Sequence, residues 1–342
     1  MDMPKAIDKV ITGKNLSQEE MRDVMRMIMT GQATDAQIGG FLVGLRLKGE
    51  TVDEIVAAAS VMRELATRVD TKGLNIVDTC GTGGSGSNKF NVSTAAAFVT
   101  AAAGVKVAKH GNRGASSKSG SADLLEKAGA NIMLSPEEVA RCIVDIGVGF
   151  MFAASHHAAM KHAINARKEM VVRTIFNLLG PLTNPAGARR QVLGIFDRKW
   201  LRPLAEVLKQ MGSEHVLVVH SRDGLDEISI ADKTDVVELK DGVIREYTIG
   251  PEDFGMQVSS LRPLVVTNPE ESLVLVRAAL SGENQAAADM VILNAGAAIY
   301  AGGASRNLEQ GIEMARDAVS SGMAAEKMKD FVEYTSQLAE AG

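Results

Sequence analysis

A glycine-rich stretch between a predicted strand and a predicted helix is the first place in this chain where the residue types indicate chemistry. Residues 78–94 read DTCGTGGSGSNKFNVST, follow the apolar segment 74–77 and run into the alanine-rich segment 95–103. Glycine lets backbone N–H groups approach an anion closely, and a helix start adds unpaired donors and the positive end of the helix dipole. We therefore expect this first glycine loop to hold an anion such as phosphate.

A second loop repeats the arrangement about twenty-five residues later. Residues 109–121 read KHGNRGASSKSGS, follow the predicted strand 105–108 and enter a predicted helix at 122. Lys109, Arg113 and Lys118 add full positive charges to the backbone donors. Loops on successive crossovers of a parallel sheet meet at one edge, where ligands usually bind. One ligand with phosphate groups at two places would satisfy both loops, which favours a binding site over two plain tight turns.

Two better-known phosphate-binding motifs are excluded. The glycines at 81–86 are not followed by Lys-Ser or Lys-Thr, which a Walker-type loop requires. The first glycine loop also lacks the acidic residue that dinucleotide-binding folds carry at the end of a following strand. The pair of loops therefore indicates a different phosphate ligand.

Adjacent carboxylates at Asp226 and Glu227 follow the predicted strand 216–219. Such a pair on a turn suits Mg²⁺, which keeps several waters and bridges to substrate phosphates. An isolated Asp-Glu pair is usually a solvated surface turn. Together with two phosphate loops, the pair predicts a magnesium site.

Other reactive residue types give weaker signals. His157 and His162 are five residues apart and would lie on different faces of a helix, so a zinc site is not expected. Cys80 reads as a small packing residue rather than a nucleophile. The turn at 177–185 contains two prolines, and its expected role is a structural connection.

The elements that must position these residues fall into two regions. Residues 1–70 are predicted to be helical, with capping boxes at 17–20 and 51–54. From about residue 74 strands and helices alternate, as in a parallel sheet with helical crossovers. The predicted strands are 74–77, 105–108, 192–195, 216–219 and 264–267, the segment 286–303 reads as a buried helix, and the last helices are expected at 308–320 and 324–338.

The predicted fold class is α/β. A small helical domain, residues 1–71, precedes a larger domain, residues 72–342, with a mainly parallel central sheet flanked by helices. The segment 160–185 begins as a basic helix, and we expect it to lie against the N-terminal helices and complete the small domain.

Composition limits the partners of this 342-residue chain. Hydrophobic residues make up 46% and aromatic residues only 4%, which suits closely packed helices on a sheet in more than one domain. The net charge of −5 argues against a nucleic-acid partner. Two cysteines without metal spacing, no apolar leader and no long apolar span predict a cytoplasmic protein without a membrane partner.

The two glycine loops, the turn at 177–185 and the acid pair together resemble the anthranilate phosphoribosyltransferases of tryptophan biosynthesis. The shared motifs are GTGG at 81–84, FNVST at 90–94, KHGNR at 109–113, GPLTNP at 180–185 and the acid pair at 226–227. The likeness covers essentially the full length, including the helical start with QIG at 37–39 and KGET at 48–51.

The resemblance implies transfer of phosphoribose from phosphoribosyl pyrophosphate to the amine of anthranilate, and a homodimer formed through the helical part. It assigns Mg²⁺ to Ser93, Asp226 and Glu227, and anthranilate to Gly81, Asn112 and Arg167. It assigns phosphoribosyl pyrophosphate to a larger set in the two loops: Gly81, Gly84, Ser85, Lys89, Asn91, Val92, Ser93, Thr94, Lys109, His110, Gly111, Asn112, Arg113, Gly114, Ala115, Ser116, Ser117 and Ser121.

This chemistry needs neither a nucleophilic side chain nor a strong base. Loss of pyrophosphate leaves an oxocarbenium-like sugar, so the main task is to stabilise negative charge on the leaving group. The aromatic amine is already unprotonated at neutral pH, so positioning matters more than deprotonation.

The chain departs from the family pattern at three positions. Ser85 stands where the family has an acid, and Lys89 where it has a threonine, which makes the first glycine loop more cationic. We expect either tighter pyrophosphate binding through Lys89 or loss of a metal-linked contact at Ser85. Ala158 replaces the proline of the family's His-Pro, which affects the expected acceptor side of the site.

Three alternatives are weighed at this point. Nucleoside phosphorylases of the same architecture carry a glycine loop that begins Lys-His-Ser, whereas this loop begins at Asp78 and Thr79. A nucleic-acid-binding relative would be expected to show a basic stripe, and 37 basic against 42 acidic residues argue against it. Phosphoribosyltransferases for other aromatic amines or acids are harder to separate, because Asn112 and Arg167 specify a carboxylate only loosely.

Overall fold

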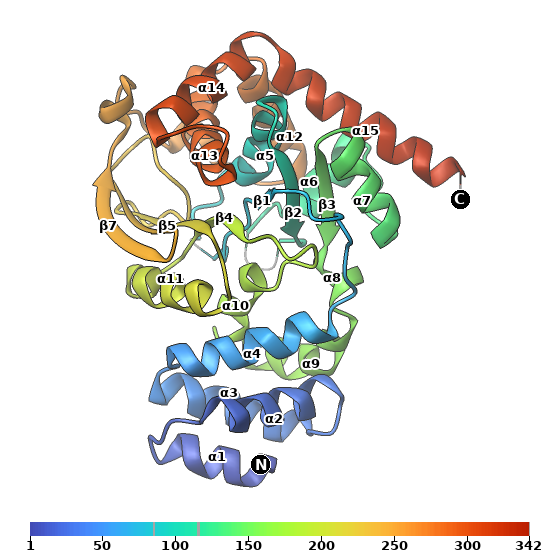
Figure 1. The fold of residues 1–342 in the computed structure, drawn as a ribbon, viewed down its shortest axis with the longest axis vertical. Helices are drawn as coiled ribbons and strands as arrows, with labels where there is room; N and C mark the ends of the chain where they lie inside the picture. Colours follow the sequence, from blue (N-terminus) through green and yellow to red (C-terminus); the bar gives the residue numbers. More distant parts are fainter. Residues whose placement is uncertain (85, 115–116, 342) are drawn as a thin grey trace.

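Five helices form a bundle beneath the rest of the molecule in the computed structural model, which describes residues 1–84, 86–114 and 117–341 (Figure 1). Four of them open the chain: α1 (Met3–Ile11), α2 (Gln18–Met29), α3 (Asp35–Lys48) and α4 (Val52–Leu65). The fifth, α9 (Lys161–Met170), comes from the middle of the sequence and packs against α2 and α3. The bundle is therefore built from two separate stretches of the chain.

Reciprocal capping starts the bundle helices where the sequence predicts. Ser17 before α2 and Thr51 before α4 each accept a hydrogen bond from the backbone three residues on, and the glutamates at 20 and 54 complete both boxes. Thr34 caps α3 in the same way with Gln37. Each such cap satisfies donors that would otherwise lack a partner and contributes about 1 kcal/mol.

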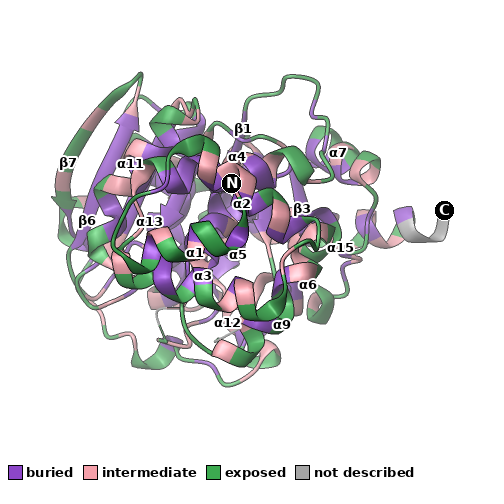
Figure 2. Cartoon of the chain, turned by 90° about the horizontal axis from the view of Figure 1, so that it is seen from below, coloured by how far each residue is buried: buried purple, intermediate pink, exposed green. Residues whose placement is uncertain are grey.

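Seven strands form one sheet in the order β3-β2-β1-β4-β5-β6-β7. The first five in this order are parallel: β3 (Val148–Phe152), β2 (Lys106–Gly111), β1 (Ile76–Asp78), β4 (Arg190–Gly194) and β5 (His215–Ser221). β6 (Thr234–Lys240) and β7 (Val243–Ile249) continue it as antiparallel strands. β7 lies at the edge and is mostly exposed (Figure 2). The predicted mainly parallel sheet is thus confirmed.

One predicted strand is wrong. The segment 264–267 follows a short 3₁₀ turn, Arg262–Leu264, and makes only a single antiparallel bridge, between Val265 and Lys89. Pro263 lacks a backbone donor and fixes its own φ, which suits the turn rather than a strand. The segment instead braces the first glycine loop, since Val266 N–H donates to the Asn88 carbonyl at 2.8 Å.

Alternate side chains of the central strands pack into two different hydrophobic cores, one on each face of the sheet. On β5, Leu217 and Val219 face the core that contains α5 (Val92–Ala102) and α13 (Gln285–Gly302), while Val216 and Val218 face the core shared with α11 (Leu201–Gln210) and the bundle. This period of two is the geometry of a strand with both faces covered. The remaining longer helices are α6 (Ser121–Ala128), α7 (Pro136–Asp145), α12 (Pro269–Leu280), α14 (Leu308–Ser320) and α15 (Met323–Ala341).

No helix in the described part of the chain is long and apolar enough to cross a membrane. The long apolar helix α13 is instead surrounded by protein: most of its residues are buried, and it packs against α14, α5 and the sheet.

Val171 ends α9 in the left-handed region, with φ +52° and ψ +27°, and its side chain is 85% exposed. A β-branched residue is strained in this conformation by roughly 1–2 kcal/mol, and its exposed side chain gives little packing in return. We therefore expect Val171→Gly to raise the free energy of unfolding by about 1 kcal/mol, measured by urea unfolding. The neighbouring Val172→Gly, whose φ is not positive, should lower it. Equal effects of the two substitutions would contradict the strain.

Candidate functional site

A cavity of about 580 Å³ opens where the carboxyl ends of the parallel strands meet the side of the bundle that carries α9. Both glycine loops line it, together with the acid pair and the segment after α9. The predicted site residues brought together here are Gly81, Gly84, Lys89, Asn91, Ser93, Lys109, His110, Gly111, Asn112, Arg113, Gly114, Ser117, Ser121, Arg167, Asp226 and Glu227.

A few predicted residues lie elsewhere. The side chains of Val92 and Thr94 are buried at the start of α5 and do not line the cavity. Thr94 still contributes indirectly, since its hydroxyl donates to the Ser121 hydroxyl at 3.0 Å and links the starts of α5 and α6. Ser85, Ala115 and Ser116 lie outside the described residues.

A buried carboxylate, Asp78 at the end of β1, connects the elements around the cavity. Its two oxygens accept hydrogen bonds from the His110 backbone at 3.2 Å and from the Asn184 amide at 2.7 Å. Asn184 also donates to the carbonyl of Ala108 on β2, at 2.9 Å. Burial raises the pKa of Asp78 to about 6. The structural role expected for the turn at 177–185 is thus visible at Asn184.

The first glycine loop lies close to the acid pair. The Thr82 N–H donates to the Gly194 carbonyl at 2.8 Å, which fixes the loop against the end of β4. A Cβ added at Gly81 would lie 3.3 Å from an oxygen of the Asp226 carboxylate. Glycine at this position therefore permits the close approach of backbone and carboxylate.

Lys109 places a buried positive charge at the base of the cavity. Its ammonium donates to the carbonyl of Thr79 at 3.0 Å and to the hydroxyls of Thr79 and Ser93, each at 3.3 Å. Burial lowers the pKa of Lys109, while the nearby charges of the Asp78 and Glu227 carboxylates oppose that shift. The base of the cavity is therefore suited to an anion.

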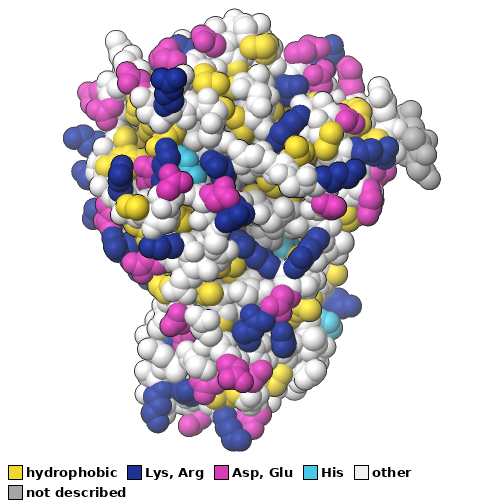
Figure 3. Space-filling view, viewed as in Figure 1, with side chains coloured by type: hydrophobic (Ala, Val, Ile, Leu, Met, Phe, Trp, Pro, Cys, Tyr) yellow, Lys and Arg dark blue, Asp and Glu magenta, His cyan; other side chains and the backbone are white. Residues whose placement is uncertain are grey.

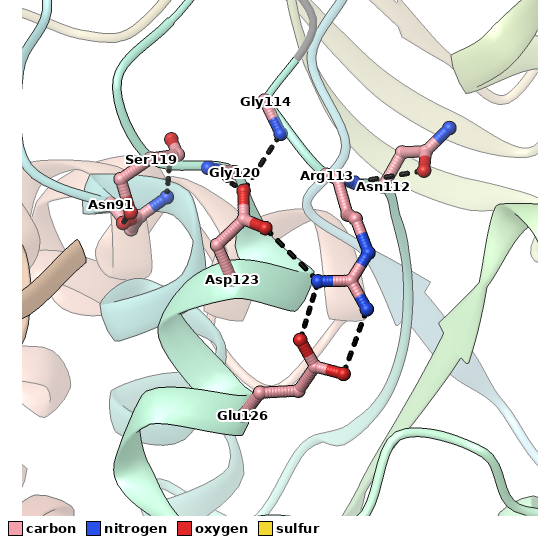
Figure 4. Close-up of polar contacts among 8 residues, drawn as sticks. All are labelled: Asn91, Asn112, Arg113, Gly114, Ser119, Gly120, Asp123 and Glu126. Carbon is pink, nitrogen blue, oxygen red and sulfur yellow. Dashed lines mark hydrogen bonds and ion pairs between the residues drawn. The ribbon is translucent and has the colours of Figure 1, made fainter. Parts of the chain in front are cut away.

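The second glycine loop is closed by the first turn of α6 (Figure 4). One oxygen of Asp123 accepts hydrogen bonds from the backbone N–H groups of Gly114 and Gly120, each at 2.9 Å. A Cβ at Gly120 would lie only 2.2 Å from the Gly114 nitrogen, so the closure requires glycine there. Arg113 pairs with Asp123 and Glu126, so α6 neutralises its charge.

Asn91 joins the first glycine loop to the second. Its amide oxygen accepts hydrogen bonds from the Ser119 hydroxyl at 2.7 Å and the Ser272 hydroxyl at 2.6 Å. Its amide nitrogen donates back to the Ser119 carbonyl at 3.2 Å (Figure 4). The two loops are thus held side by side, as their positions on neighbouring parallel strands predict.

The acid pair has a donor set that fits Mg²⁺. Burial raises the pKa of Glu227 well above its usual value, and the neighbouring charge of Asp226 raises it further. A cation beside this pair would offset the repulsion, and Mg²⁺ is commonly bound by one or two carboxylates plus substrate phosphates. Within the described residues no larger group of His, Cys, Asp or Glu could hold a metal. The pair is therefore suited to a shared metal rather than an all-protein cage.

The sequence analysis missed Arg173, which follows α9. Its guanidinium donates to the carbonyl of Gly84 and lies 4.3 Å from the centre of the Phe196 ring. Arg46 of α3 in turn donates to the Arg173 carbonyl. Arg173 thus links the bundle to the first glycine loop, and the basic run at 161–173 was the only sequence signal for it.

Burial shifts the pKa of two further groups near the cavity, the guanidinium of Arg167 and the thiol of Cys80. The Arg167 guanidinium lies 5.2 Å from the centre of the Phe176 ring, and burial lowers its pKa. Burial also raises the pKa of the Cys80 thiol, which disfavours the thiolate that a nucleophile needs.

Two buried histidines, His110 in the cavity wall and His157 behind it, have ring nitrogens without hydrogen bonds. The rings of His110 and His157 lie 5.2 Å apart, and both nitrogens of His110 and Nε2 of His157 lack a partner among the described atoms. Burial lowers the pKa of His110 to about 3 and that of His157 to about 4. Both rings are therefore neutral in the folded protein at neutral pH.

Acidification should destabilise the protein through these histidines. Because their folded pKa values are depressed, the unfolded chain binds protons first, and stability is lost as the pH falls below the ordinary value near 6.5. Each should cost on the order of 2 kcal/mol between about pH 7 and pH 5. Urea unfolding of wild type and His157→Asn at both pH values tests this. A variant with an undiminished pH dependence would contradict it.

Comparison with known proteins places both parts of the fold in one family. A model of the glycosyl transferase family, helical bundle domain, matches residues 4–66, and a model of the glycosyl transferase family, a/b domain, matches residues 73–325. An anthranilate phosphoribosyltransferase from Cellvibrio japonicus is 59% identical over 99% of this chain and 100% of that protein. One from Ectopseudomonas mendocina is 59% identical over 98% of each chain.

Solved structures of anthranilate phosphoribosyltransferases have the same fold as this chain. The anthranilate phosphoribosyltransferase (TrpD) from Thermus thermophilus superposes with a TM-score of 0.91 at 44% identity, covering 96% of this chain and 99% of that one. The enzyme from Saccharomyces cerevisiae, in complex with PRPP and Mg, gives a TM-score of 0.88 at 26% identity over 98% of each chain.

Proposed function

We infer the reaction from one premise: this chain belongs to the anthranilate phosphoribosyltransferase family. It is a transferase that moves the phosphoribosyl group of phosphoribosyl pyrophosphate (PRPP) to the amine of anthranilate, in tryptophan biosynthesis. The observation that carries the assignment to this cavity is the buried Lys109 between two glycine loops, opposite the acid pair.

We assign PRPP to the two glycine loops. Backbone donors of the first loop and the ammonium of Lys109 would face its phosphate groups, which gain most from fixed positive charge in a cavity with little water. Lys89 adds a further charge at the rim: its ammonium donates to the Ser87 carbonyl at 3.1 Å, and it lies in the field of Glu227. This supports the expectation that Lys89 strengthens pyrophosphate binding.

We assign Mg²⁺ to Asp226, Glu227 and Ser93. The three residues line one cavity, where the Ser93 hydroxyl lies beside Lys109 and the Asp226 carboxylate beside Gly81. When bound, Mg²⁺ supplies charge neutralisation to the phosphate oxygens of the leaving group. The structure of the yeast enzyme with PRPP and Mg supports this assignment.

The chain's own residues would act by positioning. The amine nitrogen of anthranilate forms a bond to C1 of the ribose while the bond from C1 to the pyrophosphate oxygen breaks, and the amine then releases a proton. Lys109 and the loop N–H groups stabilise the charge that develops on pyrophosphate. Arg167, on the α9 side of the cavity, would bind the carboxylate of anthranilate, and Asn112 would orient the ring.

The helical bundle is the proposed surface for a homodimer. Ile11 of α1 is 63% exposed and Leu47 of α3 is 83% exposed. Burying such apolar side chains against a second copy would stabilise the association.

A fluorescence assay of anthranilate consumption with PRPP and Mg²⁺ tests the function. We expect turnover by the wild type and a loss of at least about a hundredfold in Asp226→Asn/Glu227→Gln, because the developing charge loses its metal. Asp232→Asn, an exposed acid after the same turn, serves as the control and should retain turnover. No turnover by folded wild-type protein, or full activity in the double variant, would contradict the proposal.

Arg173 should matter for PRPP binding more than for the chemical step. Arg173→Ala removes the contact to Gly84 that holds the first glycine loop, so we expect the Michaelis constant for PRPP to rise about tenfold with a smaller change in kcat. Lys168→Ala removes an exposed charge of the same sign from α9 and is the matched control. Steady-state kinetics with identical constants for both variants would overturn the role of Arg173.

A further inference from the structure

A second hollow lies on the opposite edge of the sheet from the catalytic cavity. Its volume is about 830 Å³, and it borders the amino ends of β1 and β4, where Ile76 and Arg190 begin the strands. Two chain segments that connect the bundle to the sheet domain, 68–76 and 184–190, form most of its wall. Figure 3 shows several Lys and Arg side chains on one face of the molecule, at the level where the bundle meets the sheet domain.

Positive charge predominates in the wall of this hollow. Four arginines line it, against two acidic residues, Asp70 and Glu214. Glu214 pairs with two of the arginines at once, Arg189 at 2.8 Å and Arg190 at 3.2 Å. One carboxylate thus offsets two guanidinium groups, and an excess of positive charge remains. The catalytic mechanism uses none of these residues.

Arg63, at the end of α4, is a partly buried cation in the same wall. Its Nε donates to the Leu182 carbonyl at 2.6 Å, and burial lowers its pKa. Among the described residues no carboxylate lies within ion-pair distance of Arg63 or of the exposed Arg68 on the linker. An anion that enters the hollow could therefore pair with Arg63 or Arg68 without displacing a carboxylate.

Arg190 is a further guanidinium in the same wall, but its donors are already placed. Its Nη1 donates to the Ala301 carbonyl at 3.1 Å and its Nη2 pairs with Glu214, while its Nε is buried without any partner in the described structure. A buried Nε has no surface open to the hollow, so the arginines that an anion there could contact are Arg63, Arg68 and the exposed Arg189.

We propose that this hollow is a second binding site, for a small anion with two or more negative charges carried by phosphate or carboxylate groups. The fork of a guanidinium matches either group, and several arginines together select a multiply charged ligand over chloride. A ligand held by Arg63 and Arg68 would bridge the end of α4 to the linker that leads to β1. Its occupation would therefore stiffen the connection between bundle and sheet domain.

Isothermal titration calorimetry tests the site with two probes, citrate and inorganic phosphate, which separate carboxylate from phosphate chemistry. The catalytic cavity also attracts anions, so the comparison is between variants. We expect Arg63→Gln/Arg68→Gln to weaken the binding of at least one probe about tenfold or more, and Arg141→Gln, an exposed arginine on α7, to leave both unchanged. Anion binding should also raise the wild-type melting temperature more than that of the double variant.

The double variant could lose binding simply because it folds poorly, so Arg68→Gln alone is measured as well. Arg68 is exposed and makes no ion pair in the described structure, so its substitution should not affect folding. It should weaken binding about threefold while the melting temperature without anion stays unchanged. Equal affinities and stoichiometries for wild type, Arg68→Gln and the double variant would overturn the proposal. So would the absence of any binding by the wild type. Neither result would bear on the transferase reaction, which the fluorescence assay tests separately.

Discussion

A buried carboxylate at the end of a central strand holds the two glycine loops beside each other. Asp78 accepts from the backbone of His110, where the second glycine loop begins, and from the side chain of Asn184 in the turn that leads to β4. A carboxylate without exposed surface is tolerated only when hydrogen bonds and nearby positive charge compensate for lost hydration. His110 and Asn184 supply the hydrogen bonds, and the charge of the nearby Lys109 ammonium favours the ionised carboxylate. These contacts fix the start of the second glycine loop and the turn before β4 relative to β1.

The same charges that stabilise the fold prepare the cavity for its ligands. Lys109 is shared between the structural Asp78 and the acidic Glu227, so neither carboxylate neutralises it fully. A ligand that brings phosphate groups together with a divalent cation satisfies both sides at once: its phosphates compensate the lysines and its cation compensates the acids. The acid pair and the cationic loops therefore belong in one cavity. Burial and the charge of Asp226 both raise the pKa of Glu227, and a bound cation would relieve that repulsion.

Short sequence patterns correctly predicted helix starts and loops, because these features depend on residues close together in the sequence. Capping boxes located the starts of α2 and α4, and the strand–glycine–helix pattern located both loops, because each depends on residues within a few positions. The β6–β7 hairpin was missed although Asp241 and Gly242 form its turn, since the exposed β7 carries charged side chains that obscured the alternation. β3 was missed because its five buried residues lack the alternation of a half-exposed strand.

Residues recruited from distant segments were beyond such signals. Arg173 reaches Gly84 from the end of α9, and the Arg63 end of α4 meets the start of β4 only through the arrangement of the two domains. Sequence spacing cannot show these contacts, because they depend on how the bundle sits against the sheet. The ligands of the two loops were predicted mainly from the likeness to a known family. The hydrogen bond between Asn184 and Asp78 could be seen only in the folded structure.

Both glycine loops and the acid pair are proposed to bind one molecule of PRPP. A crystal structure of this protein with PRPP and Mg²⁺ would show whether they do. We expect phosphate oxygens within hydrogen-bond distance of both loops, and a metal ion coordinated by Asp226 or Glu227 together with the ligand. A ligand that contacts only one loop, or a metal remote from the acid pair, would rule out a single site built from all three.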